Sequence, residues 1–157
     1  MDIGTTLGWA YAKDNKLESW GVEDFSTKVD TIHRAGLRLI KFYNWLQPFK
    51  GVDEVMYESI GANLESMPAM ETHFAMLGIV RMFCAGQNIP ISSIHNMTLK
   101  TQFAGHGGAQ KRDMCDTAHY LGWKGGLRHT DMDHDACEAA AVIFCIERER
   151  GRELLFK

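Results

Sequence analysis

Apolar and polar residues alternate along the first part of the chain, and this alternation predicts a β-hairpin. One strand is expected over residues 1–12 and an antiparallel partner over residues 17–25, because alternate side chains of a strand point to opposite faces. The polar segment 13–16 between them has the composition of a tight turn. Two later apolar runs, 52–60 and 89–94, predict further strands, and we expect the first of them to be buried.

Spacings of three and four residues between apolar positions predict helices in most of the remaining chain. Helices are expected over residues 29–49 and 69–87, a short helical turn over 98–103, and further helices over 110–121 and 135–150. A hairpin followed by alternating helices and strands is typical of an α/β fold in which a mixed sheet has helices on its faces. We therefore expect a single domain over residues 1–157.

The composition is typical of a soluble globular protein, with 45% hydrophobic and 24% charged residues. No apolar run approaches the roughly 18 residues of a membrane span, and the first residues lack a signal-peptide pattern. The four cysteines show no CxxC spacing, which indicates reduced thiols and a cytoplasmic location, in the host cell if the source is a virus. The formal charge of −3 excludes a protein that is basic all over but allows a basic face for nucleic acid.

Four carboxylates stand in or beside apolar segments, where an unpaired acid is costly to bury. Asp2 belongs to Met-Asp-Ile-Gly-Thr-Thr-Leu-Gly-Trp and Glu58 follows Val-Met-Tyr, while Asp135 and Glu138 stand three apart at the head of an apolar helix. Carboxylate oxygens are the ligands that Mg²⁺ and Mn²⁺ prefer. Two such ions ~4 Å apart can activate a water and stabilise the leaving oxygen of a phosphodiester. We therefore expect these acids to form a two-metal site.

Parts of this interpretation have alternatives. Asp135 and Glu138 also fit a helix cap, in which polar side chains three residues apart satisfy the free N–H groups of the first turn. Asp2 has one residue before it, although a catalytic acid is usually held within a strand, so we expect residues upstream of Met1 in the natural first strand. The other side chains that could take a place in the metal site are Asp131, Asp133 and His134.

A glycine-rich segment flanked by basic residues predicts a binding track for the phosphates of a nucleic acid. Glycines expose backbone N–H groups and let a phosphate approach, and lysines supply positive charge. A simple loop would explain the glycines alone, but basic residues on both sides favour phosphate binding. The candidate DNA-binding residues are Lys100, Gly105, Gly107, Lys111 and Arg112.

Taken in order, these motifs resemble those of the RuvC family of Holliday junction resolvases, within the ribonuclease H-like superfamily, over essentially the whole chain. The segment around Asp2 resembles the family's first-strand Asp, and the strand that bears Glu58 resembles the one with the second acid. Residues 100–111 match the family's Lys…Gly-x-Gly…Lys segment, whose lysines contact DNA and support cleavage. The segment Asp-Ala-Cys-Glu at 135–138 resembles the closing Asp-Ala-Ala-Asp helix motif.

The resemblance implies a ribonuclease H-like, mixed five-stranded sheet flanked by helices. It also implies a homodimer that binds four-way junctions and nicks two strands symmetrically with Mg²⁺. From the carboxylate chemistry we expect two ions per site, with Mn²⁺ able to replace Mg²⁺. By the same resemblance, the metal ligands and catalytic acids are Asp2, Glu58, Asp135 and Glu138, and Lys111 supports catalysis. Bacterial relatives have a junction-stacking aromatic where this chain has Gly61, and a Met-rich stretch follows. The chain therefore resembles a divergent member, and a viral source is compatible with that.

Three other functions compete with junction resolution. A less selective ribonuclease H-like nuclease, acting on flaps, branched DNA or RNA/DNA hybrids, would use the same acids. The opening Asp-Ile-Gly-Thr-Thr also resembles the phosphate-binding turn of actin-like ATPases and sugar kinases, but those proteins need two such lobes and a much longer chain. A non-catalytic module that binds DNA junctions would not need the four acids.

Overall fold

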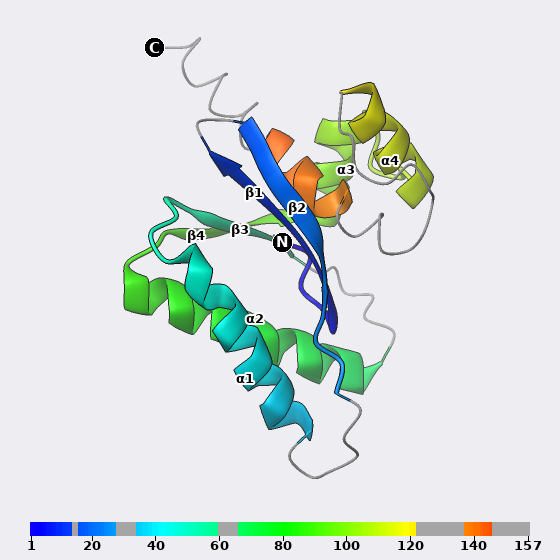
Figure 1. Ribbon diagram of the computed structural model, residues 1–157. Helices are drawn as coiled ribbons and strands as arrows, with labels where there is room; N and C mark the ends of the chain where they lie inside the picture. Colours follow the sequence, from blue (N-terminus) through cyan, green and yellow to red (C-terminus); the bar gives the residue numbers. More distant parts are fainter. Residues whose placement is uncertain (14–15, 28–33, 60–65, 122–136, 146–157) are drawn as a thin grey trace.

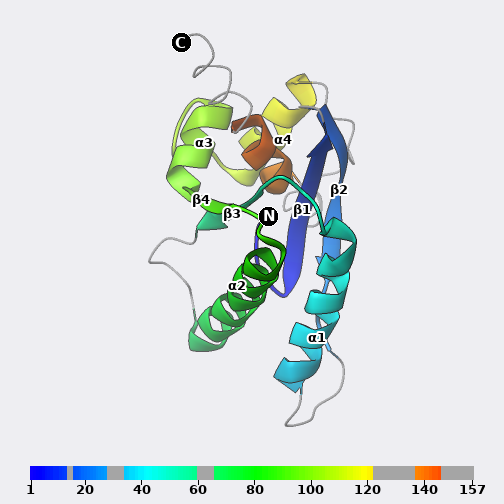
Figure 2. The ribbon, with the colours of Figure 1, turned by 90° about the vertical axis from the view of Figure 1, so that its left-hand side faces the viewer.

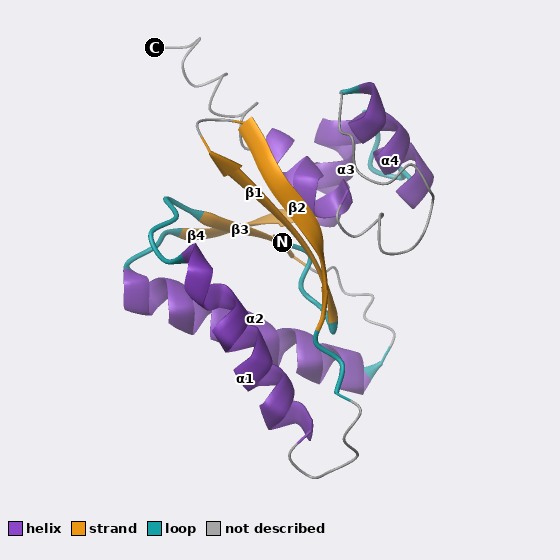
Figure 3. Ribbon diagram, viewed as in Figure 1, coloured by secondary structure: helices purple, strands orange, loops and turns teal. Residues whose placement is uncertain are grey.

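The computed structural model describes residues 1–13, 16–27, 34–59, 66–121 and 137–145 (Figure 1). Helices α1 (Arg34–Leu46) and α2 (Met67–Gln87) lie together on one side of the strands. Helices α3 (Asn96–Ala104) and α4 (Lys111–Tyr120) lie on the other side with a helix of residues 137–145, as the second view also shows (Figure 2). The strands run between the two helical groups (Figure 3). This is the predicted α/β arrangement.

The first two strands form the predicted hairpin. Strand β1 (Thr6–Lys13) pairs antiparallel with β2 (Lys16–Asp24), and Ala10 lies opposite Trp20. Leu7 on β1 is fully buried against the α1 and α2 side, whereas Trp20 packs against the core on the opposite side. The two faces of the hairpin therefore contribute to two separate cores, as the alternating pattern requires.

Residues 1–5 do not continue β1, so the strand predicted over 1–12 is wrong at its start. The chain reverses around Gly4, and Asp2 lies opposite Gly8 with backbone hydrogen bonds of 2.9 and 3.2 Å. A Cβ atom at Gly4 would lie 3.1 Å from the carbonyl oxygen of Thr6, so the reversal leaves little room for a side chain there. Asp2 is thus held beside the hairpin and not within its strand.

Strands β3 (Val55–Ser59) and β4 (Ile91–His95) form a parallel pair in which Glu58 lies opposite Ile94. Parallel neighbours need a long crossover connection, and helix α2 provides it. Opposite residues of a sheet share a face, and Ile94 packs in the core formed with α3 and α4. The side chain of Glu58 therefore points toward that helical layer.

Met1 joins the parallel pair to the hairpin. Its backbone nitrogen donates to the carbonyl oxygen of Met56 at 3.0 Å, and its carbonyl oxygen accepts from the backbone nitrogen of Glu58 at 2.9 Å. Asp2, the next residue, pairs with the hairpin at Gly8. Of the five strands that the resemblance implies, the described residues contain four, and Met1 and Asp2 lie between the two pairs.

The first core lies under α1 and α2. Phe42 of α1 is fully buried and contacts Phe25 edge-on, with ring centroids 5.1 Å apart. Burying one such side chain contributes roughly 1.5–3 kcal/mol. The helix expected over 29–49 is observed as α1 followed by a short 3₁₀ helix, Gln47–Phe49, and residues 28–33 lie outside the described part of the chain.

Local signals at the ends of α2 explain why this helix has its observed length. The side chain of Ser66 accepts a hydrogen bond from the backbone nitrogen of Ala69, and a proline stands in the first turn. Asn88 ends the helix in the left-handed conformation, with φ of 55°. Helix α3 begins at Asn96 and is longer than the turn predicted over 98–103.

The second core joins α3, α4 and the helix of residues 137–145. Leu99 of α3 and Met114 of α4 are fully buried against Cys137 and its neighbours. Residues 139–141 are alanines, which let this helix approach the sheet closely. The helix predicted over 135–150 is confirmed for residues 137–145, and the rest of that prediction lies outside the described residues.

Candidate active site

Glu58 is a buried acid at the carboxyl end of β3. Its side chain is 8% exposed and faces the layer of α3, α4 and residues 137–145. One carboxylate oxygen, Oε1, accepts a hydrogen bond from the side-chain nitrogen of Asn96. The other oxygen, Oε2, is buried without a hydrogen-bond partner in the described part of the chain. A buried carboxylate oxygen in this state is open to a proton donor or a cation.

Glu138 is the second buried acid, at 8% exposure near the start of the helix of residues 137–145. The pKa of Glu138 is raised to about 7, first because burial removes the carboxyl group from water. The negative charges of Glu58 and Asp2 raise that pKa further. The positive charges of Lys111 and Lys100 lower it. Four other predicted site residues therefore lie close enough to Glu138 to act on its carboxyl group.

Asp2 reaches this site through its position in the backbone. It follows Met1, whose carbonyl oxygen accepts from the backbone nitrogen of Glu58. The turn around Gly4 then holds Asp2 against Gly8 of β1. The two acids predicted on separate strands are thus close, because Met1 bonds to β3 and the next residue, Asp2, pairs with β1.

The fourth predicted acid, Asp135, lies outside the described residues, as do Asp131, Asp133 and His134. Within the described ranges, no three histidine, cysteine, aspartate or glutamate side chains come close enough together to hold one metal ion. The donors present nonetheless suit a hard divalent cation, because they are carboxylates, two of which raise the pKa of the third, and one buried oxygen lacks a partner among the described residues. The chemistry of this acid cluster fits Mg²⁺ or Mn²⁺.

The predicted phosphate track surrounds the junction of α3 and α4. Lys100 is half-buried on α3, and Lys111 is the exposed first residue of α4. Gly105 ends α3 with φ of 90°, a conformation that side chains rarely adopt. A Cβ atom at Gly107 would lie 3.1 Å from the hydroxyl oxygen of Thr101, so this glycine permits close packing of the loop. The structure therefore brings the two lysines to the acids.

Arg112 is less closely tied to the acids than the two lysines are. Its side chain is 78% exposed and lies 3.6 Å from the carboxylate of Asp116, one helical turn further along α4. Lys111 before it lowers the pKa of Glu138, whereas Arg112 is not among the charges that shift that pKa. Exposed pairs of this kind contribute little to stability, so Arg112 keeps its positive charge at the surface of α4.

Asn96 was not predicted as a site residue. It follows β4 directly, and the parallel pairing of β3 with β4 brings it beside Glu58. Its position in the sequence could have identified it. The residue that follows one parallel strand lies beside the end of the neighbouring strand. A polar side chain at that position is therefore a candidate partner for an acid on the adjacent strand.

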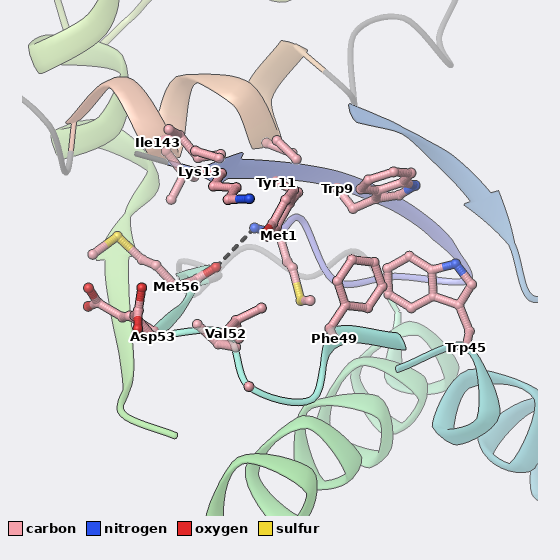
Figure 4. A pocket seen from close by; sticks show the side chains of 17 residues that line it. Met1, Trp9, Tyr11, Lys13, Trp45, Phe49, Val52, Asp53, Met56 and Ile143 are labelled. Carbon is pink, nitrogen blue, oxygen red and sulfur yellow. Dashed lines mark hydrogen bonds between the residues drawn. The ribbon is translucent and has the colours of Figure 1, made fainter. Parts of the chain in front are cut away.

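A cavity of about 630 Å³ opens between β1 and β3, but it is separate from the acid cluster (Figure 4). Met1 lies in it, and Trp9, Trp45 and Phe49 close one end. Centroids of the Trp9 and Trp45 rings are 5.8 Å apart, edge to face. The acids Asp2, Glu58 and Glu138 do not line this cavity.

The chain has the fold of RuvC. It is similar to RuvC of Thermus thermophilus in complex with a Holliday junction substrate, with a TM-score of 0.66 and 20% sequence identity over 92% of this chain and 91% of that one. A second Thermus thermophilus RuvC structure gives a TM-score of 0.61 and 20% identity over 93% of both chains. Ydc2, the yeast mitochondrial Holliday junction resolvase, gives 0.63 and 13% identity over 90% of this chain and 73% of that one. No protein-family model and no curated protein sequence matches the chain.

Proposed function

We propose that this RuvC-like protein is a metal-dependent endonuclease that resolves four-way DNA junctions by paired symmetric nicks. One observation supports it above all: Asp2, Glu58, Lys100 and Lys111 all act electrostatically on the buried carboxyl group of Glu138. Acids can bind a metal cation and the neighbouring lysines can bind a phosphate, so this arrangement suits metal-dependent cleavage of a phosphodiester. The solved neighbours, which include a RuvC bound to a Holliday junction and the resolvase Ydc2, support the choice of a junction as substrate.

In this proposal Asp2, Glu58 and Glu138 hold two Mg²⁺ ions, with Asp135 as the fourth ligand and Mn²⁺ as a substitute. When bound, divalent ions of this kind activate water and stabilise charge on the phosphodiester. The unpartnered Oε2 atom of Glu58 is available for a cation. The raised pKa of Glu138 means that a cation would be bound in exchange for a proton near neutral pH.

The lysines position and neutralise the scissile phosphate. Lys111, exposed at the start of α4, contacts the phosphate near the acids and supports catalysis, while Lys100 supports it from α3. Gly105 and Gly107 lie in the loop between the two lysines, where their backbone N–H groups are candidates for phosphate contacts. Arg112 extends this basic track along α4. Phosphate contacts of this kind set position and affinity but read no sequence.

A homodimer would supply two acid clusters for two nicks. Helix α2 exposes an apolar stripe, formed by Met67, Phe74 and Met82, which are 66%, 55% and 54% exposed. Spacings of seven and eight residues place these side chains on one face of the helix. Large apolar side chains exposed on one helix face suit a surface that another protein covers, and we assign it to a second copy of this chain.

The decisive test is cleavage with Mg²⁺ of four substrates: a four-way junction, a flap, a plain duplex and an RNA/DNA hybrid. We expect paired, symmetrically placed nicks on the junction and little cleavage of the others. Equal cutting of all four would instead identify a less selective ribonuclease H-like nuclease.

For variants of the acids, the matched control for the change in overall charge is Asp53→Asn. Asp53 is an exposed loop acid that precedes β3 and does not act on Glu138.

A further inference from the structure

Asn96 contacts the acid cluster through a side-chain hydrogen bond. It is the first residue of α3 and stands two positions after Ile94, which pairs with Glu58 across the parallel strands. Its side-chain nitrogen donates a hydrogen bond to Oε1 of Glu58. The contact joins residues that are 38 positions apart in the sequence. It therefore results from the pairing of β3 with β4 and not from a local turn.

This contact restrains how the carboxylate of Glu58 is rotated. With Oε1 held by the amide, Oε2 stays buried and without a partner among the described residues. Hydrogen bonds to a charged group are stronger than those between neutral groups, which is enough to favour one side-chain orientation. A lysine or arginine at this position would also hold the carboxylate, but it would cancel the negative charge that a cation needs. An amide orients Glu58 and leaves its charge intact.

We propose that Asn96 is a positioning residue that holds Glu58 so that its second carboxylate oxygen can bind a divalent cation. This inference rests on the proposed function, because it assumes that Glu58 is a metal ligand. Partners that orient a ligand from behind typically change metal affinity 10–100-fold when they are removed. Asn96 therefore acts through Glu58 and touches neither the metal nor the DNA.

The test measures Mn²⁺ binding to the full chain by calorimetry, without DNA, so that the readout is independent of cleavage. The variants Asn96→Ala and Asn96→Leu both remove the donor, and the second keeps the side-chain volume in case the first fails to fold. We expect the Kd for Mn²⁺ to rise roughly 10–100-fold in both. Asn96→Gln keeps an amide donor and should recover part of the affinity. Thr98→Ala, an exposed residue of the same helical turn, is the control and should bind as the wild type does.

A second readout separates positioning from a general structural role. If Asn96 acts through the metal site, a higher Mg²⁺ concentration should restore junction cleavage by Asn96→Leu, while its affinity for the junction in EDTA stays unchanged. Wild-type affinity for Mn²⁺ in folded Asn96→Leu would overturn the inference and leave the proposed function standing. Failure of the wild-type protein to bind Mn²⁺ or to cut the junction would overturn the proposed function and, with it, the role of Asn96.

Discussion

The imidazole Nδ1 atom of His73 lies 2.8 Å from the carbonyl oxygen of Ile3, so helix α2 holds the segment that contains Asp2. Because a carbonyl oxygen only accepts, the ring must donate through Nδ1–H, which fixes the tautomer. The His73 side chain is buried, at 4% exposure. Helix α2 therefore has two roles. Its buried face holds the segment with Asp2, and its exposed face carries the apolar stripe.

We expect His73→Leu to destabilise the fold by about 1–3 kcal/mol, because the buried carbonyl oxygen of Ile3 would lose its donor. Urea denaturation of the variant and of the wild type measures the difference. The variant should also lose cleavage activity, since the segment with Asp2 is no longer held. Gln87→Ala, at an exposed position at the end of the same helix, should be neutral in both measurements. Equal stability of the two variants would remove His73 from this role.

Neutralising any one of the acids should abolish cleavage and spare binding. For Asp2→Asn, Glu58→Gln, Glu138→Gln or Asp135→Asn, losing several kcal/mol of metal-dependent stabilisation corresponds to a roughly thousandfold lower rate. Single-turnover assays with Mg²⁺ measure this loss, and gel-shift titration in EDTA should give wild-type junction affinity. Full activity of any of these variants would exclude that residue from the metal site, and Asp53→Asn should cut normally.

The titration of Glu138 should make the metal-free protein less stable as the pH rises. Burial and the neighbouring acids raise its pKa from an ordinary value of 4.5 to about 7. The folded protein therefore binds this proton more tightly than the unfolded chain does. The resulting stabilisation is fully present below about pH 4.5 and is lost as the pH rises through about 7. The difference between the two pKa values corresponds to roughly 3 kcal/mol.

Denaturation midpoints in EDTA at pH 5 and pH 8 test this titration. Other groups titrate as well, so the relevant quantity is the difference between the wild type and Glu138→Gln, which cannot ionise. We expect the wild type to lose more stability than the variant between these two pH values. Mg²⁺ should reverse the trend in the wild type, because a bound cation favours the ionised acid. Identical pH profiles for the two proteins would show that Glu138 does not titrate in this range.

Lys111→Ala should weaken junction binding and lower the cleavage rate, because this side chain faces both the acids and the phosphate track in our proposal. Removing one phosphate contact should reduce the slope of log affinity against log salt by about 1. Arg112→Ala should show a smaller effect on rate, since Arg112 pairs with Asp116 and is highly exposed. Fluorescence anisotropy over a salt series measures the slope. A slope unchanged by Lys111→Ala would exclude Lys111 from the DNA contacts.

Elements with a strong local pattern could be predicted from the sequence. Alternation over the hairpin predicts β1 and β2, and helical spacing predicts α4 over 110–121, against an observed span of Lys111–Tyr120. Glu58 was predicted near the end of its strand and is the fourth residue of β3. These features depend on the spacing of apolar residues within one segment, and this spacing can be read directly from the sequence.

The features that could not be predicted depend on backbone geometry or on contacts between distant segments. The turn around Gly4 removes Asp2 from the strand, and a glycine in an alternating pattern does not distinguish a strand from a reversal. The contact of Asn96 with Glu58 follows from the parallel pairing of β3 with β4, which no local pattern encodes. The same limit applies to the raised pKa of Glu138, because it depends on acids and lysines from four other segments.

Phe74→Asp should convert the proposed dimer to a monomer, because it places a charge in the middle of the apolar stripe of α2. Multi-angle light scattering after gel filtration compares the mass of the variant with that of the wild type.

The monomer should retain its acids and nick a junction once, so the two nicks should no longer occur within the lifetime of one complex. A supercoiled cruciform plasmid distinguishes the outcomes, since coupled nicks give linear product and single nicks give open circles. Met97→Asp, which changes an exposed apolar side chain of α3 in the same way (61% exposed, against 55% for Phe74), is the matched control and should remain dimeric. A wild-type protein that is itself monomeric, or a dimeric Phe74→Asp variant, would show that the stripe on α2 is not the dimer surface.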